Sequence, residues 1–289
     1  MSDSQTAVQQ QAGSLLSAQE LPALAELRDL LHRLDRRNYP EVDDYTWEEI
    51  YGHGDNMAPG ALYLAARMTR AANLKPGDLV LDIACGKGDS SLFLAERFGV
   101  TVVCFDLWIS SSFLGRKIQE RGCRSQVIPL DLDASKRLPL PEEYFDAMFC
   151  MQALHCFGTD LAVLRRLLKH LKPGGRLLVG GTCFNQEAST DGLPEIYSQT
   201  EGWEAEYANY HSPPWWEELF LATGMVEVAE CSELEDGLIM WEDELFHHGQ
   251  RAGWTEEWYR KARWLIDQLL FSHDHTPYLT HYVATVQKK

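Results

Sequence analysis

The residues best suited to binding a ligand lie in one short stretch, Leu79-Val-Leu-Asp-Ile-Ala-Cys-Gly-Lys-Gly88. It predicts a buried strand from Leu79 to Ala84, a loop with glycines at 86 and 88, and a helix from Asp89 to Gly99. Glycine lets the backbone approach a ligand closely because no Cβ intervenes. The next strand, 101–106, ends in Asp106 at about the spacing from the glycines that a ribose-binding carboxylate requires. The pattern therefore predicts an adenosine-type cofactor on an open α/β sheet.

The features that this loop lacks indicate which cofactor it binds. A dinucleotide-binding loop has a third glycine, which packs the helix N-terminus close to a pyrophosphate, but position 91 is Ser, and Asp89 would repel phosphate. The sequence has no G-x-x-x-x-G-K-[ST], so a P-loop is excluded. Carboxylates at Asp82 and Asp89 suit a phosphate-free cation. S-adenosylmethionine, with its sulfonium and ammonium groups, fits this description better than the nicotinamide cofactor of a dehydrogenase.

Four motifs in order make the chain resemble the class I S-adenosylmethionine-dependent methyltransferases over residues 45–289. They are Asp82-Ile-Ala-Cys-Gly-Lys-Gly88, Phe105-Asp106, Leu138-Pro-Leu-Pro-Glu-Glu-Tyr-Phe-Asp146 and Leu171-Lys-Pro-Gly-Gly-Arg-Leu-Leu-Val179. Residues 153–160, 211–216 and 235–237 resemble a small-molecule branch often labelled cyclopropane-fatty-acid-synthase-like or methyltransferase type 11. The resemblance implies the cofactor and the reaction, but not the acceptor.

The resemblance also implies which residues hold the cofactor. Asp82 is expected to orient the methionine ammonium, and Asp106 to accept hydrogen bonds from the ribose hydroxyls. Either Asp131 or Asp133 is expected to take the adenine amine, and spacing does not decide between them. The aromatic face of Tyr51 is a candidate contact for the sulfonium. The full set of expected cofactor contacts is Tyr51, Asp82, Ala84, Gly86, Gly88, Asp106, Leu107, Asp131, Leu132, Asp133 and Met151, with Gln152 beside the methionine tail.

His155 is the first candidate for a general base, because it follows the fourth predicted strand and a neutral imidazole can take a proton from the acceptor. His211 is the second, and for both a purely structural role remains the alternative. An aromatic set could line an acceptor pocket or could hold a lid to the sheet: Trp203, Tyr207, Tyr210, Trp215 and Trp216. No metal site is expected from His247-His248 or His273-Asp-His275, because neither shows the spacing of a ligand set.

Composition excludes several classes of partner. With 26 Lys and Arg against 43 Asp and Glu, the net charge is −17, which disfavours nucleic acid and an anionic membrane surface. The seven cysteines show no disulfide-like spacing, and neither a signal peptide nor a membrane-spanning run is evident. A cytoplasmic protein is the expectation. A predicted helix over 20–36, with Leu24, Leu27, Leu31 and Leu34 on one face, packs either on its own core or in a homodimer.

Alternating strands and helices predict the α/β class, with a Rossmann-like seven-stranded, mostly parallel sheet, helices on both faces and a helical cap. The expected division is a disordered tail at 1–14, an N-terminal helical cap at 15–74, and a methyltransferase domain at 75–289 with lid insertions at 184–211 and 237–275. A helix capped at Thr159 or Asp160 is expected to bury Leu171 and to stop at Pro173-Gly174. Later strands are expected over 125–130, 147–151, 176–180, 226–228 and 282–286.

The function predicted first is in-line methyl transfer to a small acceptor through O, N, S or C. Such a displacement needs alignment and desolvation more than acid–base chemistry. One alternative is a C-methylating or cyclopropane-forming enzyme that acts on a lipid-like alkene. Another is a cofactor-binding subunit without catalysis, which the intact glycines and Asp106 disfavour.

Overall fold

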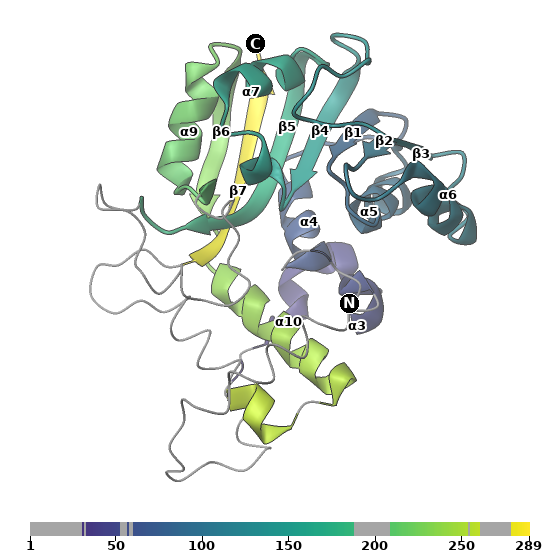
Figure 1. The fold of residues 1–289 in the computed structure, drawn as a ribbon, viewed down its shortest axis with the longest axis vertical. Helices are drawn as coiled ribbons and strands as arrows, with labels where there is room; N and C mark the ends of the chain where they lie inside the picture. Colours follow the sequence, from purple (N-terminus) through teal and green to yellow (C-terminus); the bar gives the residue numbers. More distant parts are fainter. Residues whose placement is uncertain are drawn as a thin grey trace.

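A mixed sheet of seven strands forms the centre of the molecule, as the ribbon of the computed structural model shows (Figure 1). The structure describes residues 31, 33–52, 57, 60–187, 209–253, 255–260 and 279–289. The predicted tail at 1–14 and most of the helix predicted over 20–36 lie outside these residues. The strands are β1 (Leu79–Ile83), β2 (Thr101–Phe105), β3 (Val127–Leu130), β4 (Phe145–Met151), β5 (Leu171–Phe184), β6 (Val226–Glu233) and β7 (Leu279–Lys288).

The strand order is β3-β2-β1-β4-β5-β7-β6. Neighbours from β3 to β5 are parallel, whereas β7 runs antiparallel to both β5 and β6. Four of the five residues of β1 are buried, as expected for a parallel strand that is covered on both faces. The predicted seven-stranded, mostly parallel sheet is confirmed, and β7 is its one antiparallel member.

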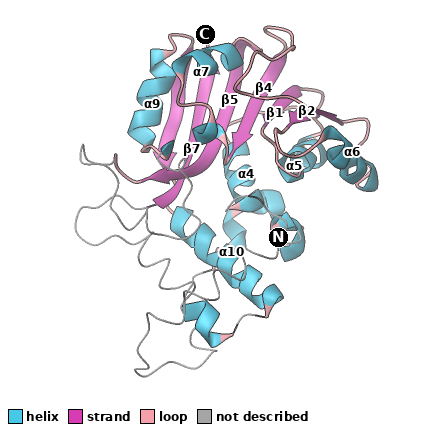
Figure 2. Ribbon diagram, viewed as in Figure 1, coloured by secondary structure: helices cyan, strands magenta, loops and turns pink. Residues whose placement is uncertain are grey.

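Helices cover both faces of the sheet (Figure 2). One buried cluster joins α4, α5 and α6 to one face through residues such as Val80 and Phe149. A second cluster joins α7 and α9 to the other face through residues such as Leu81 and Met148. The α-helices are α3 (Trp47–Ile50), α4 (Ala61–Thr69), α5 (Asp89–Phe98), α6 (Ser111–Glu120), α7 (Leu161–Leu168), α9 (Pro213–Ala222) and α10 (Gly237–Ala252); the short 3-10 helices are η2 (Arg36–Asn38), η3 (Pro40–Val42) and η5 (Leu154–Cys156).

Two predicted helix ends are wrong. Helix α7 begins after the Asp160 cap, as predicted, but ends at Leu168 rather than at Pro173. Leu171 instead begins β5 and pairs with Phe145 in the parallel ladder. The helix predicted over 20–36 does not extend to its predicted end, because residues 33–35 are not helical and Arg36 begins the 3-10 helix η2. The Leu34 N–H donates to Asp243 Oδ1 there.

Strands β5 and β7 are longer than the sequence predicts. β5 and β7 pair along nine residues, from Arg176 with Gln287 to Phe184 with Leu279. Side-chain pattern alone does not show where such a ladder ends, because the backbone pairing continues beyond the apolar run. Within the part of the chain that the structure describes, no helix has the length and hydropathy needed to cross a bilayer.

Candidate active site

A cavity of about 340 Å³ lies at the carboxyl ends of the first four strands. β1 and β4 are neighbours in the sheet although β2 and β3 separate them in the chain, so the strand order reverses between them. Open α/β sheets bind ligands at such a reversal. Met57 and parts of four loops supply the described wall: 84–90 after β1, 105–108 after β2, 132–135 after β3, and 151–157 after β4.

The loop after β1 brings the backbone close to the cavity. Ala84 and Gly86 have φ +55, and Gly88, the N-cap of α5, has φ +83. A Cβ on Gly88 would lie 3.0 Å from Leu114 Cδ2, and one on Gly86 would lie 3.2 Å from Met57 Sδ. The positive φ angles favour glycine at both positions, and a Cβ there would crowd these two side chains. Ala84 and Gly86 line the cavity, and Gly88 sets the turn into α5.

Asp106 is fixed at the end of β2 by three backbone N–H groups. Gly86 N–H donates to its Oδ2 at 2.9 Å, while Trp108 and Ile109 N–H donate to its Oδ1 at 2.8 and 3.0 Å. These bonds use three of the roughly four acceptor positions of a carboxylate. Asp106 lines the cavity and joins the glycine loop to the loop after β2. Its remaining capacity can accept a hydroxyl of a ligand.

Asp82 lies beneath the loop rather than on the described cavity wall. It is 1 % exposed, and its Oδ2 accepts hydrogen bonds from Ser90 at 2.7 Å and Ser91 at 2.6 Å. Burial raises the pKa of this carboxyl to about 6, although the two serine hydroxyls act against that rise. Ser91, which stands where a dinucleotide-binding loop has glycine, therefore serves as a hydroxyl donor to Asp82. The predicted contact of Asp82 with the methionine ammonium stays a prediction.

The structure separates the two acidic candidates after β3. Asp133 lines the cavity, and its Oδ1 accepts from Ser135 N–H at 2.9 Å and from the Ser135 hydroxyl at 2.6 Å. Asp131 is not among the described wall residues, and both of its oxygens accept from Ser111, at the start of α6. These serine hydrogen bonds lower the pKa of both carboxyls. Asp133 is the better placed of the two to meet a ligand.

Apolar side chains surround the same end of the cavity. Leu107, Leu132 and Met151, all expected from the sequence, are on its wall. Trp108 is also there and was not predicted, although a large aromatic residue directly after a strand-ending acid is a signal that could have found it. Leu107 and Trp108 are 65 % and 69 % exposed, so large apolar surfaces are available to a flat ligand.

The end of β4 supplies a polar group held in one orientation. Gln152 has φ +54, and its N–H donates to the Gly180 carbonyl oxygen at 2.7 Å. Its Oε1 accepts from the N–H and the hydroxyl of Thr182, at 2.8 and 3.1 Å. Left-handed backbone at a residue other than glycine is uncommon and is often found at binding sites. Gln152 lines the cavity together with Cys156 and Phe157.

His155 lies in η5, next to the cavity but not among its described wall residues. It is 8 % exposed, and its ring meets that of Tyr210 edge-on, with centroids 4.5 Å apart. Burial lowers the pKa of the imidazole to about 4, so His155 is neutral at physiological pH. A neutral imidazole can accept a proton, and the role of His155 as a base stays a prediction.

His211 lies in a different environment. Its Nδ1 is 3.0 Å from Glu187 Oε2, and its ring stacks on that of Trp215 with centroids 3.5 Å apart. The same Glu187 accepts a hydrogen bond from Ser212 N–H, directly before α9. These contacts fix the entry to α9, which favours a structural role, and His211 is not among the described residues of the cavity wall.

Tyr51 is held in place by a hydrogen bond to helix α10. Its hydroxyl donates to Asp243, whose other oxygen accepts the Leu34 N–H at 3.1 Å. Burial raises the pKa of Asp243 to about 6, and burial also raises the pKa of Tyr51. The Tyr51 ring stacks parallel to Trp47, and the ring of His247 stacks on Trp47 at 3.7 Å. Tyr51 is not among the described wall residues of the cavity. Its predicted contact with the sulfonium stays a prediction.

Two further carboxylates of this region hold the N-terminal segment. Asp236 accepts from the Tyr39 hydroxyl, and Glu244 Oε2 accepts from Gly60 N–H at 3.0 Å. In Figure 1, α3 and α10 lie beside each other below the sheet. The described residues between Leu34 and Gly60 and helix α10, nearly two hundred residues later in the chain, therefore form one cap.

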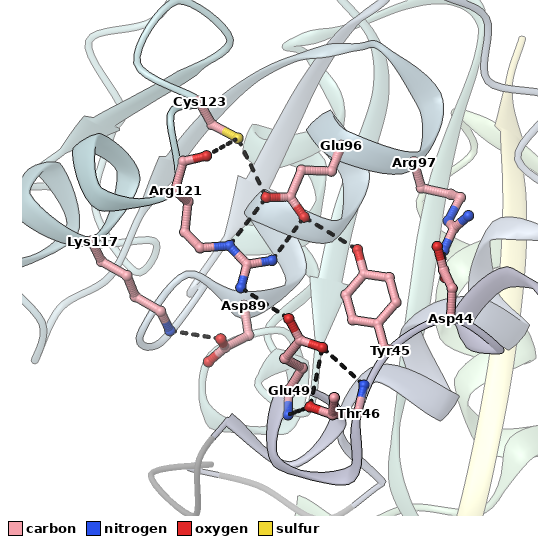
Figure 3. A network of polar contacts seen from close by, with 10 residues as sticks. All are labelled: Asp44, Tyr45, Thr46, Glu49, Asp89, Glu96, Arg97, Lys117, Arg121 and Cys123. Carbon is pink, nitrogen blue, oxygen red and sulfur yellow. Dashed lines mark hydrogen bonds and ion pairs between the residues drawn. The ribbon is translucent and has the colours of Figure 1, made fainter.

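A network of charges attaches the N-terminal segment to α5 (Figure 3). Arg121 donates to both oxygens of Glu96, at 3.2 and 3.0 Å, and is 3.5 Å from Glu49 Oε1. The Tyr45 hydroxyl donates to Glu96 at 3.3 Å. Glu49 also completes a capping box with Thr46 at the start of α3. The cap is thus fixed to the helix that leaves the glycine loop.

The predicted aromatic set is only partly described. Trp203 and Tyr207 lie outside the described residues, as do His273 and His275. Trp216 is 1 % exposed and stacks against Tyr282 of β7, so it belongs to the core rather than to an acceptor pocket. Among the residues that the structure describes, no group of three His, Cys, Asp or Glu side chains is arranged to hold a metal ion.

A family model described as a methyltransferase domain matches residues 80–175, which contain the glycine loop, Asp106, Asp133 and the end of β4. Residues 80–175 form a class I S-adenosylmethionine-dependent methyltransferase domain. This confirms the resemblance to that class, whereas the small-molecule branch stays a prediction.

Relatives of this domain act on different acceptors. The chain is 28 % identical over 167 residues to phosphoethanolamine N-methyltransferase 1 of Arabidopsis thaliana, covering 57 % of this chain and 33 % of the relative. It is 37 % identical over 111 residues to the ubiquinone/menaquinone biosynthesis C-methyltransferase UbiE of Chromobacterium violaceum, covering 37 % and 44 %. This chain thus spans less than half the length of either curated relative.

A solved structure shows the same fold with a different named activity. The crystal structure of the [4+2]-cyclase SpnF matches with a TM-score of 0.57 and 20 % identity, over 89 % of this chain and 97 % of that one. At this identity the match shows the fold alone. The activity of a methyltransferase fold is therefore to be argued from its site.

Proposed function

We propose that this protein is an enzyme that transfers a methyl group from S-adenosylmethionine to a small-molecule acceptor. The observation that carries the proposal is Asp106, a buried carboxylate held by three backbone N–H groups on the wall of a cavity at the strand-order reversal. A carboxylate so placed suits a ribose hydroxyl. The match of residues 80–175 to a methyltransferase domain supports the same cofactor.

The residues present fit the adenosine part of the cofactor. Leu107, Trp108 and Leu132 offer apolar surface for the adenine ring, and Asp133 offers an acceptor for its amine. The adenine contact is therefore proposed for Asp133, while Asp131 accepts hydrogen bonds from Ser111 at the start of α6.

Charge on the wall favours a cation over a polyphosphate. Asp89, Asp106 and Asp133 line the cavity, and Lys87 is the one Lys or Arg among its described wall residues. A pyrophosphate would meet the carboxylates of Asp106 and Asp133 on this wall. A nucleoside with a sulfonium carries a positive charge instead, which these carboxylates attract.

When bound, S-adenosylmethionine would supply an electrophilic methyl group on its sulfonium sulfur, which leaves as a neutral thioether once the S–CH3 bond breaks. The chain holds and aligns the reactants, which is where most of the rate acceleration of such a displacement arises. Apolar walls such as Met57, Met151 and Phe157 exclude water from the reacting atoms. His155, kept neutral by burial, is the proposed acceptor of a proton released by an O–H, N–H or S–H acceptor.

The identity of the accepting atom is left to experiment. The curated relatives include an N-methyltransferase and a C-methyltransferase, and C-methylation of a lipid-like alkene is therefore the second candidate. A cytoplasmic location, a homodimer, the absence of a nucleic-acid partner and the division at residues 14, 74, 184–211 and 237–275 stay predictions from the sequence.

Thermal shift with defined ligands tests the cofactor assignment. S-adenosylhomocysteine, the product of methyl transfer, is expected to raise the melting temperature, whereas NAD is not. The opposite result would overturn the proposal. Incubation with S-adenosylmethionine and a metabolite pool, read by the mass of methylated products, then separates a catalyst from a binding subunit.

A further inference from the structure

The ion pair between Asp89 and Lys117 has no role in the cofactor contacts described above, although it adjoins them. Asp89 is the first residue of α5 and lines the cavity. Lys117 lies near the end of α6, and its Nζ is 2.6 Å from Asp89 Oδ1 (Figure 3). The same Nζ donates to the Lys87 carbonyl oxygen at 3.0 Å. Lys117 thus neutralises a carboxylate of the cavity wall and holds the glycine loop at the same time.

We infer that Lys117, through Asp89, sets the relative affinity of the site for the cofactor and for its demethylated product. This inference rests on the proposed function. S-adenosylmethionine and S-adenosylhomocysteine share the adenosine, the ammonium and the carboxylate, and they differ in the methyl group and in the positive charge of the sulfonium. A charge on the cavity wall therefore acts on the first ligand and hardly on the second.

The exposure of the ion pair determines how strongly it can act on the sulfonium. The side chains of Lys117 and Asp89 are 26 % and 29 % exposed, so water screens them only in part. For unit charges on the order of 8 Å apart at an effective dielectric constant of about 40, Coulomb's law gives roughly a fivefold change in an affinity ratio. With the pair intact, Asp89 attracts the sulfonium only weakly. The site then prefers the cofactor over its demethylated product by less than an unpaired Asp89 would allow.

Two substitutions test the sign of the effect. Lys117→Met leaves the charge of Asp89 uncompensated, so the ratio of dissociation constants, cofactor over product, should fall about fivefold. Asp89→Asn leaves the charge of Lys117 uncompensated, so the same ratio should rise by a similar factor. The double variant lacks both charges, and its ratio should return to that of the unaltered protein.

The ratio distinguishes an electrostatic role from a structural one. Lys117 also holds the Lys87 carbonyl, so its loss should also displace the glycine loop. That structural effect weakens the binding of both ligands alike, so any change in the ratio reports the electrostatic effect. Lys172→Met is a matched control, because Lys172 Nζ is also 2.6 Å from a carboxylate, Asp146, at the amino end of β4 and away from the cavity wall. Raising the salt concentration to 1 M should return the ratio of Lys117→Met toward that of the unaltered protein.

The assay is isothermal titration of the full chain with each ligand, after circular dichroism has shown that each variant is folded. Opposite shifts in the two single variants and their cancellation in the double variant would support the inference. A constant ratio in a protein that binds both ligands would overturn it and leave the proposed function intact. Binding of neither ligand by the unaltered protein would overturn both.

Discussion

The buried carboxyl of Asp82 should make the protein less stable as the pH rises from about 4 to 7. Its pKa in the folded protein is about 6, against a reference of 3.8. Between these values the folded state holds a proton that the unfolded state has lost, so the free energy of unfolding falls with rising pH. A difference of about two pKa units corresponds to about 3 kcal/mol. That amount is fully present below pH 4 and is lost above pH 6.

Asp82→Asn should remove this part of the pH dependence. Both Ser90 and Ser91 donate to the one oxygen Oδ2, so an asparagine carbonyl oxygen can accept both. Its amide N–H groups lack the acceptors that water would offer, which costs roughly 1–2 kcal/mol. The variant should therefore be more stable than the unaltered protein at pH 8, by about 1–2 kcal/mol, and less stable at pH 4.

Urea unfolding at several pH values measures both effects. The difference between the two proteins isolates Asp82, because Asp243, whose pKa burial likewise raises to about 6, is present in both. Asp146→Asn is the control of opposite sign. Burial alone would raise the pKa of Asp146, but hydrogen bonds from Leu79 N–H and Lys172 lower it, so this variant should lose stability at pH 8. Parallel pH curves for Asp82→Asn and the unaltered protein would refute the reasoning.

Three further predictions concern the cavity. Asp106→Asn should abolish the thermal shift caused by S-adenosylhomocysteine, because an amide cannot accept at both oxygen positions; an undiminished shift would contradict its role. Trp108→Ala should weaken binding of the same ligand about fivefold by titration, at the order of 1 kcal/mol for a lost aromatic contact, while Tyr144→Ala, at an exposed residue that is not on the described cavity wall, should not. Burial lowers the pKa of His155 to about 4, so no limb near pH 6.5 in the profile of kcat/KM should depend on this residue. A limb near pH 6.5 that is present in the unaltered protein and absent from His155→Gln would contradict this.

The sheet and the glycine loop could be predicted because their signals are local. An apolar run, two glycines and an acid at a fixed spacing are enough to place Gly86 and Asp106 on neighbouring strand ends, where the Gly86 N–H meets the Asp106 carboxylate. The choice between Asp131 and Asp133 is different, since both follow β3 and only the direction of each side chain separates them. Ser111 accounts for one direction and Ser135 for the other.

Long-range contacts explain the expectations that the structure does not support. The Tyr51 hydroxyl donates to Asp243, 192 residues later in the chain, and no periodicity in either segment indicates that pairing. The end of α7 was misplaced because Leu171 fits a helical pattern equally well, while its pairing with Phe145 depends on a neighbouring strand. Patterns within a segment do not report such contacts.

The cap has a consequence for the construction of chimaeras. Its two halves, the described residues of 34–60 and residues 236–252, are far apart in the sequence. The first half donates hydrogen bonds, and carboxylates of the second half accept them. Transplanting only one half from a paralogue would strand the carboxylate of Asp243 away from water and from its donors, at a cost of several kcal/mol. Chimaeras should exchange the two segments together, as a matched set.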